Sequence, residues 1–250
     1  YALNLELGNV RLDGFKHPDP LVRAAAARVA SYSSDPEIKA GLAALLRSDP
    51  RALVREAAVQ SLAEDDDIDA PLLAAALGDT DAATRRRAVD ALTRSSEEEP
   101  DADAGERIVR SRLPETALAP VLALLTREEV DEAQVEILLG RIEGPGVADK
   151  LLQALQGDGP AMLLRLAARR LAGLGEKRAG PPLLALLGKA TDPNAGQFVA
   201  DALVALDDSA VLEPLFGQLK TGTPAARRLA MNVLGRLRKP RAIWPLIAAL

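Results

Sequence analysis

The stretch that decides the fold is the last twenty-five residues, Ala226–Leu250, which read ARRLAMNVLGRLRKPRAIWPLIAAL. It contains one apolar helix pattern, a short basic turn at Arg238-Lys239-Pro240, and a second apolar helix pattern. Weaker copies of this two-helix unit recur upstream about every 31 residues. The sequence therefore predicts an all-α chain built from repeated helical hairpins.

Prolines mark the register of these hairpins. Pro120, Pro182, Pro214 and Pro245 each precede an apolar pair, at spacings of 62, 32 and 31 residues, and the first spacing is two periods. At the repeat position between Pro120 and Pro182, the chain has Lys150 in place of a proline. A proline is tolerated in the first turn of a helix, because the N–H that it lacks would have no partner within the helix. We therefore expect each of these prolines in the first turn of a second helix.

The composition agrees with a helical repeat protein. Hydrophobic residues make up 48% of the chain and aromatic residues only 2%, so the core must consist mainly of Ala, Leu and Val. Ala and Leu favour helices, whereas strands favour β-branched and aromatic residues. A single hairpin has too little apolar surface to fold alone and must stack on its neighbours. The predicted architecture is an α-solenoid of about seven repeats.

Three regions follow from this register. Residues 17–250 form the repeat array, and residues 1–16 are expected to be the tail of an incomplete repeat, although their alternating leucines also allow a strand. An acidic insertion at 94–114 interrupts the third repeat. Long connections in compact repeats are usually functional or disordered, so this insertion is predicted to be either a linker or a partner-contacting loop.

Two stretches resemble a known family. The segment Leu234–Leu250, and Asp49-Pro50 followed by Val54-Arg55-Glu56-Ala57-Ala58, look like HEAT-like repeats, in particular the short bacterial type first associated with phycobilisome bilin lyases. The resemblance covers roughly residues 17–250. It implies a right-handed solenoid whose second helices line a concave, partner-binding face.

The resemblance also implies a ladder of ion pairs between repeats. In such repeats an Asp before the first helix and an Arg inside that helix commonly form it. The matching residues here are Asp19 with Arg23, Asp49 with Arg55 and, more loosely, Asp81 with Arg85 or Arg86. Asp192 has no matching arginine. We expect this ladder to be structural.

Residue types that carry chemistry are scarce. The chain has no Cys, and His17 is the only histidine, so a thiol nucleophile and a site with several imidazole ligands are excluded. The same scarcity argues against the HEAT-like metal hydroxylases, which depend on His-Glu pairs. Acidic clusters at 64–69 and 97–103 lack the ligand order of an EF-hand. They are expected to be solvated loops, with cation or basic-partner binding as the alternative. The sequence predicts no enzyme, no cofactor and no metal.

Charge and hydropathy restrict the kinds of partner that the chain is expected to bind. The net charge is −5, yet residues 220–241 carry seven basic residues and no acidic ones. A nucleic acid is disfavoured, because Trp244 is the only tryptophan and no aromatic series accompanies these cations. The longest apolar runs are about eight residues, too short for a membrane span. A protein partner and a cytoplasmic location are expected.

Positions between the core leucines of the second helices should face outward and contact a partner. These candidate partner-binding residues are Gln153, Arg178, Glu213, Gln218, Lys220, Arg241 and Trp244. Trp244 beside Arg241 is the strongest candidate, because Trp and Arg dominate interface energetics. In the alternative, Trp244 packs against whatever follows Leu250.

The sequence thus predicts a non-catalytic protein–protein interaction scaffold that uses the face formed by its second helices. The main alternative is an accessory or catalytic subunit of a bilin-lyase-like enzyme acting on a chromophore–protein conjugate. HEAT-like DNA binding is a further alternative.

Overall fold

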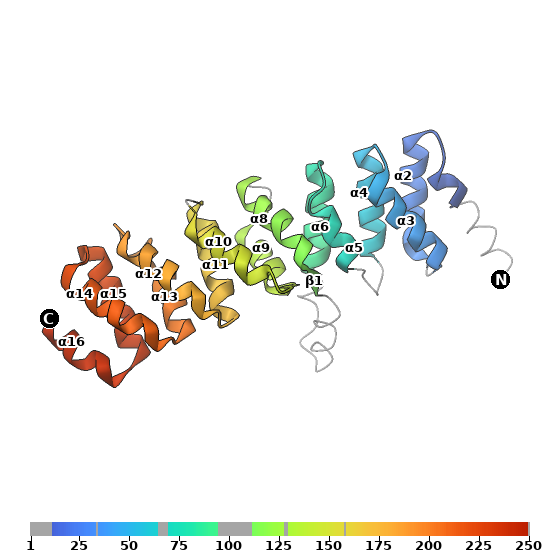
Figure 1. The fold of residues 1–250 in the computed structure, drawn as a ribbon. Helices are drawn as coiled ribbons and strands as arrows, with labels where there is room; N and C mark the ends of the chain where they lie inside the picture. Colours follow the sequence, from blue (N-terminus) through green and yellow to red (C-terminus); the bar gives the residue numbers. More distant parts are fainter. Residues whose placement is uncertain are drawn as a thin grey trace. The chain divides into compact units, whose positions relative to one another are not determined.

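The protein folds into two compact helical units, Tyr1–Gly144 and Pro145–Leu250, which we call the N-terminal and C-terminal units (Figure 1). The computed structural model describes residues 12–33, 35–64, 70–94, 112–127, 130–157 and 159–249. Each unit is described by itself below. The predicted division into residues 1–16 and a continuous array from residue 17 remains a prediction.

The N-terminal unit is a stack of short helices. They are α2 (Pro20–Val29), α3 (Pro36–Ser48), α4 (Ala52–Ala63), α5 (Ala70–Ala76), α6 (Ala82–Arg94), α8 (Leu118–Arg127) and α9 (Glu132–Arg141). First helices pack on first helices, α2 on α4 and α4 on α6, and α3 packs on α5. Two Asp-Pro steps begin helices, because Asp19 accepts the N–H of Leu21 and Asp35 that of Glu37, both at 2.9 Å.

Small side chains allow close approach of the first helices. Ala27 on α2 and Ala57 and Ala58 on α4 are fully buried. The Ser61 hydroxyl of α4 donates to the carbonyl of Ala27 at 2.6 Å, which satisfies a buried polar group between the two helices. The alanine-rich composition is therefore used at helix contacts, where a larger side chain would separate the backbones.

One feature of the N-terminal unit is not helical. Strand β1 (Leu113–Pro114) pairs in parallel with strand β2 (Ile142–Glu143), and Arg112 forms a 2.8 Å ion pair with Glu143. This two-residue pairing fastens the chain that enters α8 to the end of α9. The prediction of an all-α repeat architecture is otherwise confirmed over the described residues. Most of the predicted insertion, residues 95–111, lies outside them.

The C-terminal unit repeats one hairpin closely. Its helices are α10 (Val147–Gln156), α11 (Ala161–Gly173), α12 (Gly180–Gly188), α13 (Gln197–Leu206), α14 (Leu212–Thr221), α15 (Pro224–Leu237) and α16 (Ile243–Ala248). Helix α11 packs on α13 and α13 on α15, whereas α10, α12, α14 and α16 are the second helices. Gly175, Asp207 and Arg238, each just after a first helix, share a left-handed backbone, with φ of 65°, 44° and 49°. A left-handed residue lets the chain turn sharply after a helix.

The proline register is confirmed. Pro182, Pro214 and Pro245 are each the third residue of a second helix, and each helix follows a short 3₁₀ turn. These turns are η3 (Lys177–Ala179), η4 (Ser209–Val211) and η5 (Pro240–Ala242). In the N-terminal unit Pro120 is likewise the third residue of α8, after η2 (Glu115–Ala117).

Candidate functional site

All of the predicted partner-binding residues lie in the C-terminal unit, on second helices or on the 3₁₀ turns before them. We call this surface, formed by the exposed positions of α10, α12, α14 and α16 with their preceding turns, the second-helix face. Gln153 lies on α10, Arg178 in η3, Glu213, Gln218 and Lys220 on α14, Arg241 in η5 and Trp244 on α16. Six of the seven are exposed, and Gln218 is half-buried. Whether they bind a partner remains a prediction.

Gln218 differs from the other six because it packs against the preceding repeat. A Cβ atom added to Gly188, at the end of α12, would lie 3.1 Å from Nε2 of Gln218. The glycine therefore leaves room for this amide between α12 and α14. We expect Gln218 to hold two second helices together more than to contact a partner.

Two arginines of this face bridge neighbouring repeats. Nη1 of Arg178 lies 2.8 Å from Oδ1 of Asp149, and Nη2 of Arg241 lies 2.7 Å from Oε1 of Glu213. Each pair joins the first turn of one second helix to the 3₁₀ turn before the next one. All four side chains are 60–70% exposed. Such exposed pairs contribute little to stability, so a ligand or partner can displace them at low cost.

Arg178 is held locally as well. Its Nε and Nη2 donate to the two carboxylate oxygens of Glu176, at 3.0 and 2.7 Å. Hydrogen bonds from the Arg178 side chain and backbone lower the pKa of Glu176 to about 2. The pKa of Arg178 is raised, chiefly by its hydrogen bonds to Glu176 and Asp149. The guanidinium is always charged in proteins, and the Glu176 carboxylate orients it as long as that carboxylate is ionised.

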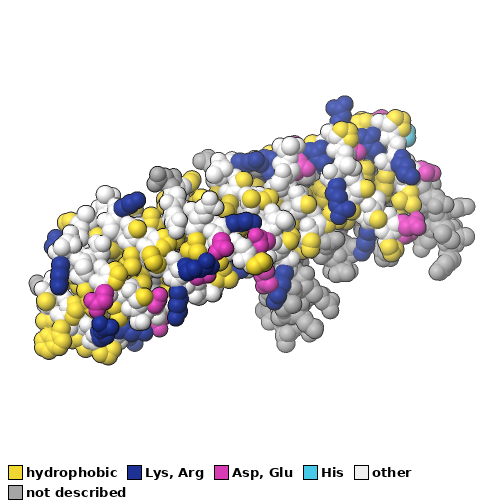
Figure 2. All heavy atoms as spheres, viewed as in Figure 1, with side chains coloured by type: hydrophobic (Ala, Val, Ile, Leu, Met, Phe, Trp, Pro, Cys, Tyr) yellow, Lys and Arg dark blue, Asp and Glu magenta, His cyan; other side chains and the backbone are white. Residues whose placement is uncertain are grey.

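Three of the seven basic residues at 220–241 form ion pairs with the preceding repeat. Besides the Arg241 pair, Arg236 forms an ion pair with Asp201, and Nζ of Lys239 lies 2.7 Å from Oδ1 of Asp207. Figure 2 shows basic and acidic side chains side by side in this part of the molecule. These pairs reduce the positive charge that the run presents to a phosphate.

Trp244 is the most exposed large apolar side chain of the described residues, at 78%. Trp244 occupies the same position in its repeat as Glu213 and Pro181 do in the two preceding repeats, and those two residues are exposed as well. Ile243 and Ile247, on the same helix, are each 54% exposed. Helix α16 thus presents an apolar surface beside the Arg241–Glu213 pair.

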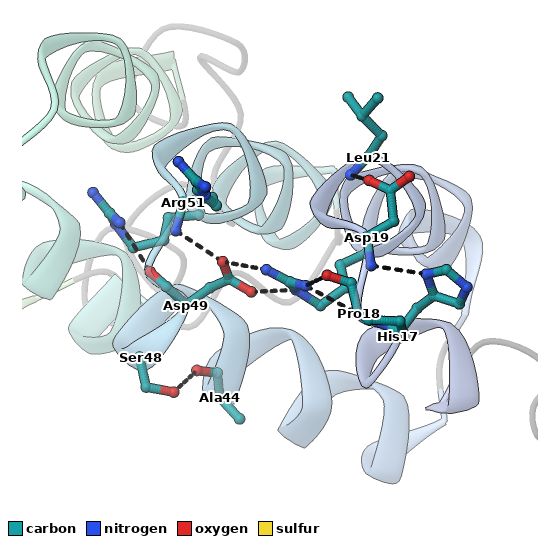
Figure 3. A network of polar contacts seen from close by, with 10 residues as sticks. His17, Pro18, Asp19, Leu21, Ala44, Ser48, Asp49 and Arg51 are labelled. Atoms are coloured by element: carbon teal, nitrogen blue, oxygen red, sulfur yellow. Dashed lines mark hydrogen bonds and ion pairs between the residues drawn. The ribbon is translucent and has the colours of Figure 1, made fainter.

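The arginine ladder lies in the N-terminal unit and is structural. Arg23 donates to both carboxylate oxygens of Asp49, at 2.7 and 3.1 Å, and Arg55 to both of Asp79, at 2.7 and 2.8 Å (Figure 3 shows the Asp49 end). The arginine of one repeat therefore binds the aspartate of the next repeat. The rung at Asp79 was not predicted, because Asp81 was matched to the motif instead.

Two of the matched aspartates have another role. Asp19 accepts the N–H of Leu21 at 2.9 Å, and Asp81 accepts the N–H of Thr84 at 2.9 Å. Both therefore cap the helix that follows them. Helix α4 begins at Ala52, after a turn in which Asp49 accepts the N–H of Arg51.

We expect the ladder to make the N-terminal unit sensitive to acid. Burial is the largest single effect and raises the pKa of Asp49 and of Asp79. The hydrogen bonds from Arg23 or Arg55, a backbone N–H and the nearby arginine charges together outweigh it, so both pKa values are below the ordinary range. A lowered folded-state pKa stabilises the fold above the unfolded-state pKa, and this contribution is lost as the pH falls through the folded-state value. The loss should occur below about pH 4.

This expectation is tested by urea unfolding of the wild type and Asp79→Asn between pH 6 and pH 2. The difference in unfolding free energy between the two proteins should shrink towards zero as the pH falls. A difference that stays constant over this range would show that the Asp79 carboxylate does not stabilise the fold in its ionised form.

The acidic clusters and apolar runs of the sequence form neither a metal site nor a membrane span within the described residues. No group of three or more His, Asp or Glu side chains that could hold a metal ion occurs there. Within the same residues no helix is long and apolar enough to cross a membrane. Most of the acidic cluster at 64–69 and all of that at 97–103 lie outside the described residues.

Comparisons with known proteins agree with this architecture. The family of HEAT repeats matches residues 9–93 and 148–230, which together are more than half of the chain. A stretch of 98 residues is 38% identical to the phycocyanobilin lyase subunit beta of Thermosynechococcus vestitus, over 39% of this chain and 45% of that protein. The chain thus spans less than half the length of this curated relative.

Solved structures show a likeness of fold. The karyopherin Kap121p, bound to the SUMO protease Ulp1p, matches 92% of this chain over 29% of its own length, with a TM-score of 0.52 and 16% identity. The complex of CpcE and CpcF of phycocyanin lyase from Nostoc sp. PCC7120 matches 97% of this chain and 94% of its own, with a TM-score of 0.38 and 16% identity.

One expectation from the sequence is overturned by these comparisons. The scarcity of catalytic residue types predicted a protein that is not an enzyme, yet the curated relative is a subunit of a lyase. That prediction was wrong because it assumed that an active chain carries a recognisable constellation of its own. The chain belongs to the family of HEAT repeats, as its stacked hairpins, its proline register and the matching segments together establish.

Proposed function

We propose that this protein is a subunit of a bilin-lyase-like enzyme that acts on a chromophore–protein conjugate. The observation that carries this proposal is the 38% identity, over 98 residues, to a phycocyanobilin lyase subunit. HEAT repeats alone would not support the proposal, because the fold serves many functions.

The chemistry available to this chain restricts its role. With no cysteine in the sequence, the chain cannot itself hold a bilin through a thioether. A bilin must therefore be bound non-covalently, and any thiol in the reaction belongs to the other protein. The role that remains is to bind and orient the chromophore, the acceptor protein, or both.

The second-helix face has the side chains that such binding requires. A bilin is a linear tetrapyrrole with an extended apolar π-system and two propionates. Trp244, at 78% exposure, offers an aromatic surface for the former. Lys220 and Arg241 are exposed cations that can bind the propionates. The exposed ion pair of Arg241 with Glu213 is weak, so a propionate can replace Glu213 in it.

A protein partner is expected on the same face. The elements of this face are short helices that pack on the first helices, so little backbone order has to be gained on binding. Trp and Arg are the residues in which interface energy concentrates. Gln153, Arg178 and Glu213 supply polar contacts around them.

The test is a titration of the purified chain with phycocyanobilin, followed by visible absorbance. A saturable change of the long-wavelength band, complete near one equivalent, is expected, because a bound bilin is extended and shielded from water. Denaturation in urea should release the chromophore, since no covalent bond to the chain can form. An absorbance that stays that of free phycocyanobilin at all ratios would contradict the proposal.

A further inference from the structure

The turn before α2 repeats a structure that recurs before α4 and α6, with one residue exchanged. In each of these repeats, Nη1 of an arginine donates to the backbone carbonyl of the residue six positions earlier. The pairs are Arg23 with His17 at 2.8 Å, Arg55 with Asp49 at 2.9 Å and Arg85 with Asp79 at 2.6 Å. His17 therefore occupies the position of the ladder aspartate in the first repeat.

The side chain at this position has a second, shared role. It accepts the backbone N–H two residues further on. Oδ1 of Asp49 accepts from Arg51 at 2.9 Å, and Oδ1 of Asp79 accepts from Asp81 at 2.8 Å. Nδ1 of His17 accepts from Asp19 at 3.1 Å (Figure 3). The imidazole has replaced a carboxylate while keeping its hydrogen bond.

We propose that His17 makes the first repeat, and not the second or third, open in mild acid. Nδ1 can accept a hydrogen bond only in the neutral tautomer that carries its proton on Nε2. A protonated imidazole has a donor on each nitrogen, so Nδ1–H then faces the N–H of Asp19. A carboxylate at the same position remains an acceptor at that pH.

The surrounding charges act in both directions. The Arg23 guanidinium, which donates to the carbonyls of His17 and Pro18, and the preceding Lys16 oppose a second positive charge. Asp19 favours it, but its carboxylate also caps α2 through the N–H of Leu21. Asp49 is bound to Arg23. Asp13, in the helical turn at 12–15, is an acidic residue four positions before His17 in the sequence.

The effect reaches beyond the turn itself. Arg23 connects α2 to the next repeat through Asp49, and its other contacts are the carbonyls of the His17 turn. When this turn opens, the guanidinium loses the backbone acceptors that orient it. The first repeat should then loosen against the second, while the equivalent turns at Asp49 and Asp79 stay closed.

The experiment is NMR of the full chain at pH 7.5 and pH 5.5, with His17→Asn as the matched control. Asparagine accepts the same hydrogen bond and does not titrate. At pH 7.5 the ¹⁵N shifts of His17 should show the proton on Nε2. At pH 5.5, amide exchange of Asp19, corrected for its intrinsic pH dependence, should rise about fivefold in the wild type and not in His17→Asn.

The amides of Arg51 and Asp81 are internal controls, because they make the same hydrogen bond to carboxylates. They should show no such rise. The proposal is overturned if the His17 proton lies on Nδ1 at pH 7.5, or if wild type and His17→Asn respond equally to acid. It is also overturned if Arg51 and Asp81 respond as strongly as Asp19. None of these outcomes depends on the proposed lyase function.

Discussion

Replacing Arg55 by alanine should destabilise the N-terminal unit by about 2 kcal/mol. Arg55 gives two hydrogen bonds to Asp79 and a third, at 2.9 Å, to the carbonyl of Asp49. Its loss leaves the Asp79 carboxylate, whose side chain is 9% exposed, with the N–H of Asp81 as its remaining donor. The value lies below that of a fully buried pair because water reaches both side chains.

Urea unfolding followed by far-UV circular dichroism measures this effect, and Arg51→Ala is the matched control. Arg51 precedes α4 and is exposed, and no ion pair of its side chain occurs among the described residues. The two variants lose the same charge, so they differ in the contacts that Arg55 makes to Asp79, Asp49 and Thr80. Equal stabilities for the two variants would show that the rung to Asp79 contributes nothing.

Replacing Trp244 by alanine should weaken phycocyanobilin binding about 30-fold, the effect of an interface residue worth roughly 2 kcal/mol. The indole is 78% exposed, so it stabilises the fold little and its removal should leave the circular dichroism spectrum unchanged. Binding would bury this surface, and alanine removes most of the area that can be buried.

Met162→Ala is the control for this variant. Met162 is also an exposed apolar side chain of the C-terminal unit, at 37%, but it lies on the first helix α11. It should bind phycocyanobilin as the wild type does. If both variants bind equally well, the second-helix face is not where the chromophore lies.

The elements of the fold that the sequence predicts well are those governed by local rules. Prolines in the register of 31 or 32 residues correctly marked the first turns of α12, α14 and α16. Asp19 and Asp35 cap the starts of α2 and α3 by an equally local rule. The parallel pairing of Leu113 with Ile142 was not foreseen, because a two-residue strand carries no periodic pattern.

Side-chain partners across repeats were harder to predict. Asp49 was assigned to Arg55 of its own repeat, whereas its carboxylate binds Arg23 of the preceding one. Sequence spacing gives the distance along the chain, but the partner depends on how two hairpins stack. The pairs of Arg178 with Asp149 and of Arg241 with Glu213, separated by 29 and 28 residues, repeat nearly one period and could have been found by that regularity.

The prediction that the chain is not an enzyme was wrong for a different reason. Lack of Cys, with His17 as the only histidine, limits what the chain can do by itself. It does not limit what the chain does with a chromophore or a second protein that supplies the reacting groups. The candidate residues on the second-helix face remain predictions until binding is measured.

Amide hydrogen exchange of the full chain, with and without excess phycocyanobilin, tests the central claim most directly. We predict slower exchange concentrated in α14, η5 and α16, where Lys220, Arg241 and Trp244 lie, with little change in α11, α13 and α15. No protection anywhere, or protection confined to the first helices, would contradict the claim that the second-helix face binds the chromophore.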